Sequence, residues 1–308
     1  MPPVAVIDIG SNTIKLLVAA RDEAGRVQAL ATRTIEARIS AGIGRDHPYL
    51  AEAGIANGVA AIRELVTLAQ HHAPTRIELV ATSAVRDASN GAEFVARVLD
   101  ATGQRIRVLN GDEEADFIGR GLTTDPELAH LRDFHVFDLG GGSLECLAFH
   151  DRKIHQAFSA RLGCVRLTEQ FITNPAAPLL PAEETALAAH VRTVLTDRGF
   201  APQPGATAVF AGGSMTTVRA LLGASQGRPI GDTPQTIPVT TLEGFLAELR
   251  PLDLAARRVF PGLPASRADV FPAALVTMIA VAKLGGFTGY QHSFYNLRWG
   301  LAAVLLEA

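Results

Sequence analysis

The sequence predicts an α/β fold in which one βββαβα unit occurs twice, once in each of two domains. The chain has 308 residues, and about 150 residues per domain is usual. Strand-like apolar runs alternate with helix-like periodicities in both halves, which indicates mixed sheets with helices on their faces. A strand, an Asp-Ile-Gly or Asp-Leu-Gly turn and a second strand occur near Asp8 and again near Asp138. This internal repeat predicts domains 1–124 and 125–308, divided in the polar segment 123–132.

The first half begins with a predicted β-hairpin and continues with alternating helices and strands. Asn90 is expected to cap the second helix, and three acids, 112–114, fall in the first turn of the third, where the helix dipole favours them. Residues 36–50 indicate an irregular loop because they contain glycines and a proline. We expect strands at 4–9, 14–20, 26–35, 77–81 and 106–109, and helices at about 55–70, 91–102 and 111–122.

The second half repeats the three strands and is then dominated by helices. Asp269 is expected to be an N-cap, with Pro272 in the first turn of that helix. Residues 223–238, rich in proline and glycine, are expected to form a surface loop. We expect strands within 134–149 and at 153–159 and 206–210, and helices at about 166–171, 182–198, 215–222, 242–249, 269–284 and 297–306, the last of which is a candidate (297–308) for packing back on the first domain.

Composition excludes several classes of function. The chain has 48% hydrophobic and 19% charged residues, and its net charge is −3. A net charge of this sign and size does not indicate binding to a nucleic-acid duplex or to a membrane surface. No basic leader and no run of about 18 apolar residues is present, so we expect neither a signal peptide nor a transmembrane helix. The two cysteines form no CxxC pair, and a cytoplasmic location is expected. The apolar helices of the last third fit either a homodimer interface or a core.

The glycine turn after Asp138 is the strongest chemical signal. An aspartate at the end of an apolar strand is well placed to meet a cation. Gly140, Gly141 and Gly142 allow the backbone to take positive φ and leave its N–H groups unobstructed by any Cβ. An ordinary β-turn is the alternative. The second such turn, Gly10 to Thr13 after Asp8, favours a phosphate clamp across a cleft between the domains.

In that clamp, the N–H groups of residues 11–13 and 140–143 would bind phosphoryl oxygens. The two aspartates would face each other across the cleft. Such a site suits Mg²⁺, which accepts a few carboxylates, keeps several waters and bridges to substrate phosphates.

Six motifs follow one another along the chain: VIDIGSNT (6–13), ATSAVR (81–86), GDEEA (111–115), DLGGGSLE (138–145), LGCVR (162–166) and GGS (212–214). Their order and spacing resemble the exopolyphosphatase/guanosine pentaphosphatase (Ppx/GppA) family of the actin and sugar-kinase superfamily. The resemblance implies two actin-like (ribonuclease H-like) domains duplicated around an interdomain cleft. It also implies a hydrolase of phosphoanhydrides acting on polyphosphate or pppGpp, with Mg²⁺ and with a monovalent-cation requirement left open.

The resemblance implies that Glu114 is the general base, because it is the second acid of the family's G-x-E-E-A motif. A carboxylate near the terminal phosphate can orient and deprotonate a water that attacks in line. The crowded acids Asp112, Glu113 and Glu114 are expected to raise one another's pKa. Acidic capping of the helix is the alternative. Arg86 matches an arginine that meets substrate phosphate, and a solvated loop arginine is the alternative.

The remaining site residues follow from the same resemblance. Asn12 and Ser143 match phosphate contacts, and Glu145 matches an acid that holds Mg²⁺ together with Asp8 and Asp138. Arg166 is expected to attract an anion at a helix start. The two turns supply further candidate phosphate contacts: Gly10, Ser11, Thr13, Gly140, Gly141 and Gly142. Weaker candidates are expected to line the cleft: Gly212, Gly213, Ser214 and Arg298.

Other polar residues are expected to have no catalytic role. Lys15 is interpreted as a solvated strand residue rather than a phosphate ligand, and Cys164 as packing, because no activating base is in evidence. The histidines lack metal-ligand spacing. Trp299 departs from the family's S-x-x-x-L-R-x-G ending, where an acid is common, and no His-Asp pair resembles the extra region of longer members. A phosphotransferase of the same superfamily and a binding protein without turnover are the alternative functions.

Overall fold

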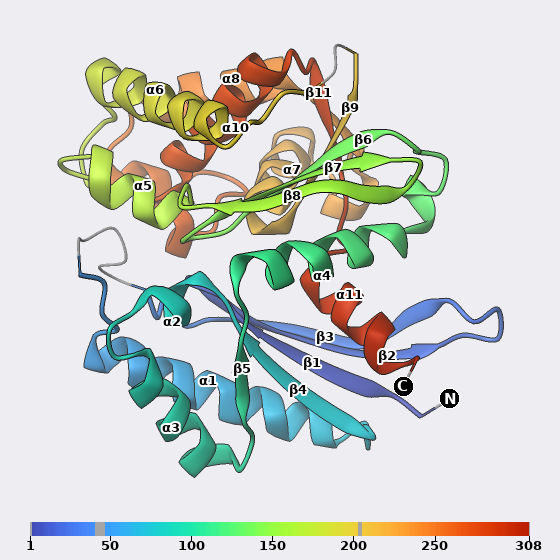
Figure 1. Ribbon diagram of the computed structural model, residues 1–308. Helices are drawn as coiled ribbons and strands as arrows, with labels where there is room; N and C mark the ends of the chain where they lie inside the picture. The colour runs from blue at the N-terminus through green and yellow to red at the C-terminus, as the bar shows by residue number, and fades with distance from the viewer. Residues whose placement is uncertain (1, 41–46, 203–204, 308) are drawn as a thin grey trace. The chain divides into compact units, whose positions relative to one another are not determined.

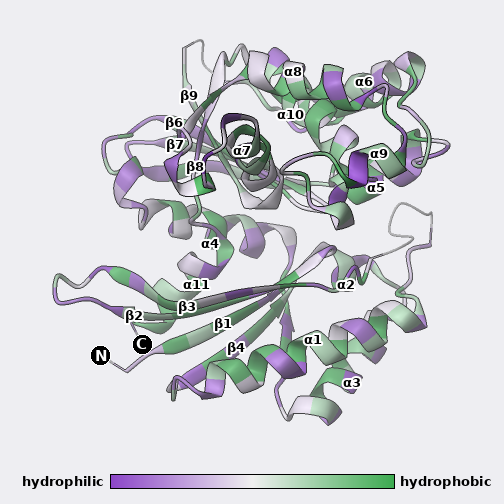
Figure 2. Cartoon of the chain, turned by 180° about the vertical axis from the view of Figure 1, so that it is seen from behind, coloured by the Kyte–Doolittle hydropathy of each residue, from purple (hydrophilic) through white to green (hydrophobic). Residues whose placement is uncertain are grey.

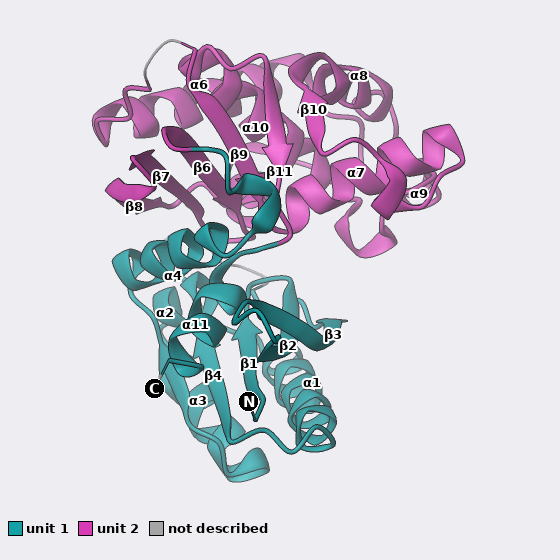
Figure 3. Cartoon of the chain, turned by 90° about the vertical axis from the view of Figure 1, so that its right-hand side faces the viewer, with its two compact units in different colours: residues 1–131, 295–308 teal, residues 132–294 magenta. Residues whose placement is uncertain are grey.

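The computed structural model describes residues 2–40, 47–202 and 205–307, and the chain divides into two compact units (Figure 3). Unit 1 comprises Met1–Leu131 and Tyr295–Ala308, and unit 2 comprises Arg132–Phe294. The first crossing lies after residue 131 rather than after 124. The 3₁₀ turn Pro126–Leu128 continues from the preceding helix and buries Leu128, so the polar segment stays with unit 1.

Unit 1 is built around a five-stranded sheet in the order β3-β2-β1-β4-β5, in which β1, β4 and β5 are parallel and β2 and β3 antiparallel. Figure 1 shows α1 and α3 on one face of this sheet. The elements are β1 (Val4–Ile9), β2 (Thr13–Arg21), β3 (Val27–Glu36), α1 (Glu52–Gln70), β4 (Arg76–Ala81), α2 (Ser83–Asp87), α3 (Gly91–Thr102), β5 (Ile106–Val108), α4 (Gly111–Thr123) and α11 (Leu297–Leu305).

Helix α11 returns to unit 1 and contacts β1, β2 and α4. Two glycines explain how closely α11 and α4 approach. A Cβ on Gly300 would lie 1.9 Å from the carbonyl oxygen of Phe117, and one on Gly121 would lie 2.0 Å from that of Asn296. Only glycine fits at these two crossing points. The final glycine of the S-x-x-x-L-R-x-G segment therefore seats the last helix against the helix that carries Glu114.

Unit 2 contains a six-stranded sheet in the order β10-β11-β9-β6-β7-β8. Its strands β6, β9 and β11 are parallel, and β7 and β8 continue from β6 as antiparallel neighbours. The elements are β6 (Phe134–Leu139), β7 (Leu144–His150), β8 (Lys153–Ala160), α5 (Cys164–Phe171), α6 (Pro181–Asp197), β9 (Thr207–Ala211), α7 (Gly212–Gln226), β10 (Thr236–Pro238), α8 (Val239–Leu249), α9 (Leu254–Arg258), α10 (Phe271–Gly285) and β11 (Gly289–His292).

The core of unit 2 is an aromatic cluster beneath α10. Phe137 and Phe210 lie with ring centroids 5.9 Å apart, and Tyr290 stacks edge-on to Phe210 at 5.0 Å. The Tyr290 hydroxyl donates to the carbonyl of Met278 at 2.8 Å, which satisfies its one polar atom. Helix α10 is buried along most of its length and is drawn mostly green in Figure 2. It contacts α6 and α8 and closes the core.

The two sheets share one topology. Read from β3 and from β8, both place three antiparallel strands first and then two parallel ones, and unit 2 adds β10 at its edge. This confirms the predicted duplication and the fold class of two actin-like (ribonuclease H-like) units. No helix in the described ranges is long and apolar enough to span a membrane.

Several local predictions were wrong. Strand β10 lies within the expected loop 223–238, and β11 lies between two expected helices, where no strand was predicted. The short helices α2 and α9 were not predicted either. The N-cap of α10 is Val270, not Asp269. Asn90 does occupy the N-cap of α3, but its amide bonds the backbone of Leu50 in both directions, at 2.8 and 2.9 Å, and makes no capping bond. The expected loop 36–50 lies partly outside the described residues.

Candidate active site

The candidate site of unit 1 forms where its three parallel strands end. β1 ends beside Asp8, β4 leads into α2 with Arg86, and β5 leads into α4 with Glu114. Backbone bonds tie these ends together, since Thr82 N–H donates to Ile9 and Leu109 N–H to Ala81. Because parallel strands present their carboxyl ends at one edge, residues far apart in sequence meet there.

The first turn is closed by the N–H of Gly10, which donates to the carbonyl of Thr13 at 3.2 Å. The chain after β3 supports it from outside: Arg38 N–H donates to the Asn12 carbonyl at 2.9 Å, and Ser40 N–H to the Ser11 carbonyl at 3.3 Å. The N–H of Gly10 is thus used within the turn. Gly10 therefore shapes the turn, and its N–H group is not available to bind phosphate. The expected phosphate-binding N–H groups of this turn are those of residues 11–13.

The Asn12 side chain is 5% exposed, and neither its Oδ1 nor its Nδ2 has a hydrogen-bond partner within the described part of the chain. A buried amide left unpaired costs about 1–3 kcal/mol. Such a group is retained where a ligand completes its bonds. Asn12 is therefore the first turn's candidate for contact with a ligand.

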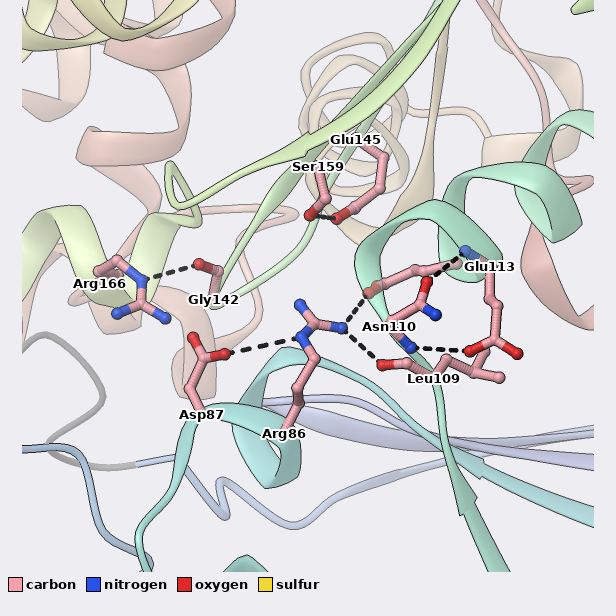
Figure 4. Close-up of polar contacts among 10 residues, drawn as sticks. Arg86, Asp87, Leu109, Asn110, Glu113, Gly142, Glu145, Ser159 and Arg166 are labelled. Carbon is pink, nitrogen blue, oxygen red and sulfur yellow. Dashed lines mark hydrogen bonds and ion pairs between the residues drawn. The ribbon is translucent and has the colours of Figure 1, made fainter. Parts of the chain in front are cut away.

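Arg86 and Glu114 form an ion pair in unit 1 (Figure 4). Arg86 Nη1 donates to Glu114 Oε2 and to the carbonyl of Leu109, both at 2.9 Å, and its Nε lies 3.6 Å from Asp87 Oδ1. Glu114 is 5% exposed. These contacts fix the carboxylate and the guanidinium against each other at the first turn of α4.

Of the neighbouring acids, Glu113 has a capping role. Its Oε2 accepts from the Asn110 N–H, and its own N–H donates to Asn110 Oδ1, both at 2.9 Å. The bond from the Asn110 backbone, and then the one from Arg107, hold the pKa of Glu113 below its usual value. The expectation that the crowded acids raise one another's pKa is therefore wrong for Glu113, because donors rather than carboxylates surround it.

Two cations act on Asp8. Burial raises the pKa of the Asp8 carboxyl, and the charges of Lys15 and Arg298 oppose that rise. Arg298 lies in the first turn of α11, and its Nη1 donates to the carbonyl of Leu16 at 3.1 Å. The last helix thus brings a guanidinium to the end of the sheet where Asp8 lies.

The glycine turn of unit 2 repeats the first turn. Gly140 N–H donates to the Ser143 carbonyl at 3.0 Å, the counterpart of the Gly10 bond. None of Gly140, Gly141 and Gly142 has a positive φ, so this turn does not use the left-handed conformation that glycine allows. The demand for space falls on Gly163 instead, because a Cβ there would lie 2.3 Å from the backbone of Gly141.

Helix α5 supports the glycine turn through its first residues. The N–H of Cys164 donates to the carbonyl of Gly140, and that of Val165 to the carbonyl of Gly141. Arg166 is 1% exposed and donates from Nε to the carbonyl of Gly142 at 2.9 Å (Figure 4). Arg166 thus holds the turn in shape. Burial raises the pKa of the Cys164 thiol, in line with its expected packing role.

Asp138 and Glu145 lie directly opposite each other on β6 and β7. Ser159, the next residue across on β8, donates from Oγ to Glu145 Oε1 at 2.7 Å (Figure 4). A Cβ on Gly212, whose φ is +82°, would lie 2.0 Å from Asp138 Oδ1. The backbone at the start of α7 therefore lies so close to the Asp138 carboxylate that only glycine fits at position 212. Ser214 Oγ donates to the carbonyl of Leu139 at 3.0 Å and ties α7 to the same strand.

A model of the Ppx/GppA phosphatase family matches residues 17–291. The chain belongs to the Ppx/GppA phosphatase family. The solved PPX-GPPA enzyme of Aquifex aeolicus is 23% identical with a TM-score of 0.80, and the match covers 98% of this chain and 99% of that one. An exopolyphosphatase from Cytophaga hutchinsonii is 20% identical with a TM-score of 0.87, covering 99% and 98%. These two likenesses show a shared fold, and the resemblance inferred from the motifs is confirmed.

In this Ppx/GppA chain, each unit gathers its own predicted residues. Among the described residues, no group of three or more His, Cys, Asp or Glu side chains could hold a metal. The pair Asp138 and Glu145 suits Mg²⁺ nonetheless, since this ion takes one or two carboxylates and completes its shell with water and phosphate. Asp8 is the single acid of the three in unit 1.

Sequence reasoning missed Arg267. Its Nη1 donates to the Gly213 carbonyl and, at 2.8 Å, to Thr217 Oγ1, so the guanidinium covers the first turn of α7. The two partners of the Gly213 bond are 54 positions apart. No periodicity or spacing joins them, and the Arg-Ala-Asp sequence before α10 carried no signal of its own.

Proposed function

We propose that this chain is an exopolyphosphatase, a hydrolase of phosphorus-containing anhydrides that removes the terminal phosphate of inorganic polyphosphate. Its membership of a phosphatase family supports the reaction class. The observation that carries the finer proposal is the ion pair between Arg86 and the buried Glu114 at the ends of two parallel strands.

In the proposed reaction, Glu114 accepts a proton from a water molecule. The water oxygen forms a bond to the terminal phosphorus, and the bond from that phosphorus to the bridging oxygen breaks. The products are inorganic phosphate and a chain shorter by one unit. Arg86 supports this role in two ways, because it fixes the Glu114 carboxylate and its fork can neutralise phosphoryl oxygens.

The two turns would hold the substrate phosphates. In unit 1 the unpaired Asn12 amide and the N–H groups of residues 11–13 suit phosphoryl oxygens. In unit 2 the turn 140–143, fixed by Arg166 and α5, offers the same kind of backbone donors. The duplicated fold therefore supplies two phosphate cradles of one design.

Asp138 and Glu145 would hold Mg²⁺ in unit 2, and Asp8 is the metal-binding candidate of unit 1. When bound, the ion would neutralise charge on the phosphoryl oxygens and so favour attack by water. The contact from Ser159 to Glu145 would keep one carboxylate oriented toward the ion.

The test is phosphate release from long-chain polyphosphate in the presence of Mg²⁺, with pppGpp as a second substrate because its terminal anhydride is chemically alike. We expect Glu114→Gln to lower kcat by about 10²–10⁴-fold while leaving polyphosphate binding measurable. Glu113→Gln is the matched control, since glutamine preserves the capping bonds, and it should keep near-normal turnover.

Absence of phosphate release from polyphosphate by folded protein would overturn the proposal. Release from pppGpp alone would assign the anhydrolase chemistry to the nucleotide and refute polyphosphate as the substrate.

A further inference from the structure

The guanidinium of Arg86 is held through two of its three nitrogens. Nη1, which carries two hydrogens, donates to Glu114 Oε2 and to the carbonyl of Leu109, both at 2.9 Å. Nε lies 3.6 Å from Oδ1 of Asp87. Figure 4 shows Asp87 and Leu109 on opposite sides of the guanidinium. Within the part of the chain that the structure describes, Nη2 is the one nitrogen of this group without a hydrogen bond or ion pair.

The contacts on both sides fix the direction of the remaining donors. A guanidinium is planar, and its N–H groups point in fixed directions within that plane. On the Nη1 side, the buried Glu114 carboxylate and a backbone carbonyl anchor the group. On the Nε side, the anchor is the Asp87 carboxylate, whose side chain is 18% exposed. With both sides held, Arg86 can offer only Nη2 to a phosphoryl oxygen.

An acid at position 87 is unfavourable for two other reasons. Asp87 is the last residue of α2 (Ser83–Asp87), and a negative charge at the C-terminal end of a helix opposes the helix dipole. A carboxylate beside an arginine that meets substrate phosphate also repels a polyanion. Neither helix stability nor substrate affinity therefore favours this acid, whereas the hold on the Arg86 guanidinium does.

We propose that Asp87 is a positioning residue for phosphoanhydride hydrolysis. It holds Nε of Arg86, so that Nη1 keeps the Glu114 carboxylate in place and Nη2 faces the terminal phosphoryl group. This inference rests on the proposed function and leaves Glu114 and Arg86 in their roles. The negative charge of Asp87 lowers the affinity for polyphosphate and raises the rate of the chemical step.

The first test separates kcat from KM for phosphate release from long-chain polyphosphate. Asp87→Asn keeps the size of the side chain and removes its charge. We expect kcat to fall about 10- to 100-fold, while KM stays the same or falls because a repulsive charge is lost. This pattern identifies an interaction that matters in the transition state rather than in substrate binding. Asp87→Glu restores the charge and should recover a large part of kcat.

Asp116→Asn is the matched control. It removes the same charge from unit 1, at an exposed position on α4 where Asp116 pairs with Arg120. We expect neither kcat nor KM to change in this variant. Urea titrations of the wild type and of both variants should give the same midpoint, which shows that the loss of kcat in Asp87→Asn is not a loss of folded protein.

A double-mutant cycle tests whether Asp87 acts through Arg86. Phosphate release is measured for Arg86→Gln with and without Asp87→Asn. If Asp87 acts by holding the guanidinium, Asp87→Asn should cost nothing further once Arg86 is gone. A purely structural role of Asp87 would give the same fold loss in both backgrounds.

Equal fold losses in the two backgrounds would overturn the inference, as would an unchanged kcat in Asp87→Asn. Either result leaves the proposed function standing, because the wild type still releases phosphate. A folded wild type that releases no phosphate from polyphosphate would instead refute the proposed function, and the inference with it. Should Asp87→Asn fail to fold, Asp87→Ser takes its place in the cycle under the same criteria.

Discussion

The turn of unit 1 and the turn of unit 2 have the same backbone frame and different support. Both are closed by one bond, from Gly10 to Thr13 and from Gly140 to Ser143. The first is supported by the irregular chain after β3, and the second by α5, Arg166 and the contact at Gly163. Duplication therefore preserved the scaffold, while the residues that surround each turn diverged.

The difference in support predicts that the unit 2 turn tolerates change least. Gly163→Ala would place a methyl group 2.3 Å from the Gly141 backbone. We expect phosphate release to fall at least 100-fold and the free energy of unfolding to drop by about 2–4 kcal/mol, measured by activity assay and urea titration.

Gly140→Ala is the control for this prediction, since its Cβ would lie at an ordinary 3.6 Å from the Ser143 carbonyl. It should cost far less of both activity and stability. Equal losses in the two variants would mean that the close approach of α5 does not shape the turn.

Asp138 lies opposite Glu145 in unit 2, whereas Asp8 lies opposite Lys15 in unit 1. This difference predicts that substitutions of the acids in the two units change Mg²⁺ affinity to different extents. Glu145→Gln removes one of two adjacent carboxylates and should weaken Mg²⁺ binding at least tenfold in substrate-free protein, measured by isothermal titration calorimetry. Asp8→Asn should weaken it less than threefold, because Lys15 and Arg298 already compensate the Asp8 charge. A larger loss of Mg²⁺ affinity in Asp8→Asn than in Glu145→Gln would show that Asp8 contributes more to the metal site than Glu145.

Acid should weaken unit 2 more than unit 1. Burial, with the charge of Arg219, lowers the pKa of His292 in unit 2 to about 3, whereas an unfolded histidine titrates near 6.5. The folded state therefore excludes a proton that the unfolded state binds. Stability is full above about pH 6.5 and falls below it, by about 2 kcal/mol between pH 7 and pH 5.

Hydrogen exchange resolved by segment should show this loss in residues 132–294 first. His292→Gln should remove most of the difference between pH 7 and pH 5, and His155→Gln, at an exposed position, should not. A pH response that is the same in His292→Gln and in the wild type would assign the acid sensitivity to other groups.

The smallest effect on Mg²⁺ binding is expected from loss of the hydrogen bond between Ser159 and Glu145 in unit 2. Ser159→Ala removes the bond to Glu145 Oε1 and should weaken Mg²⁺ binding about two- to fivefold. Thr34→Ala, the counterpart in unit 1, should have no effect on Mg²⁺ binding. Equal effects in both variants would show that the bond from Ser159 does not orient the ligand.

Sequence reasoning predicted the parts of the fold and site that have local signals. The Asp-Gly turns, the acids after β5 and the Arg86 segment each follow a short apolar strand, and strand ends in α/β sheets are where ligands bind. Asp8, Arg86 and Glu114 are accordingly brought to one edge of one sheet.

The wrong predictions depended on partners distant in sequence. β11 has only four residues, and it is a strand because it pairs with β9 and β10. Asn90 bonds Leu50, 40 positions away. The turn glycines have no positive φ, and the close approach of α5 to the turn requires a glycine at position 163 instead. None of these contacts leaves a periodic or spacing signal in the chain.

The return of α11 has a consequence for biosynthesis. Unit 1 is made of two segments separated by the whole of unit 2, and its sheet lacks the helix that covers β1 and β2 until residues 295–307 exist. Unit 2 is continuous in sequence and can fold first as the polypeptide is synthesised, against the usual N-terminal-first order. Helix α4, which carries Glu114, gains its neighbour α11 last, so a growing chain completes the packing of α4 only after all of unit 2 has been synthesised.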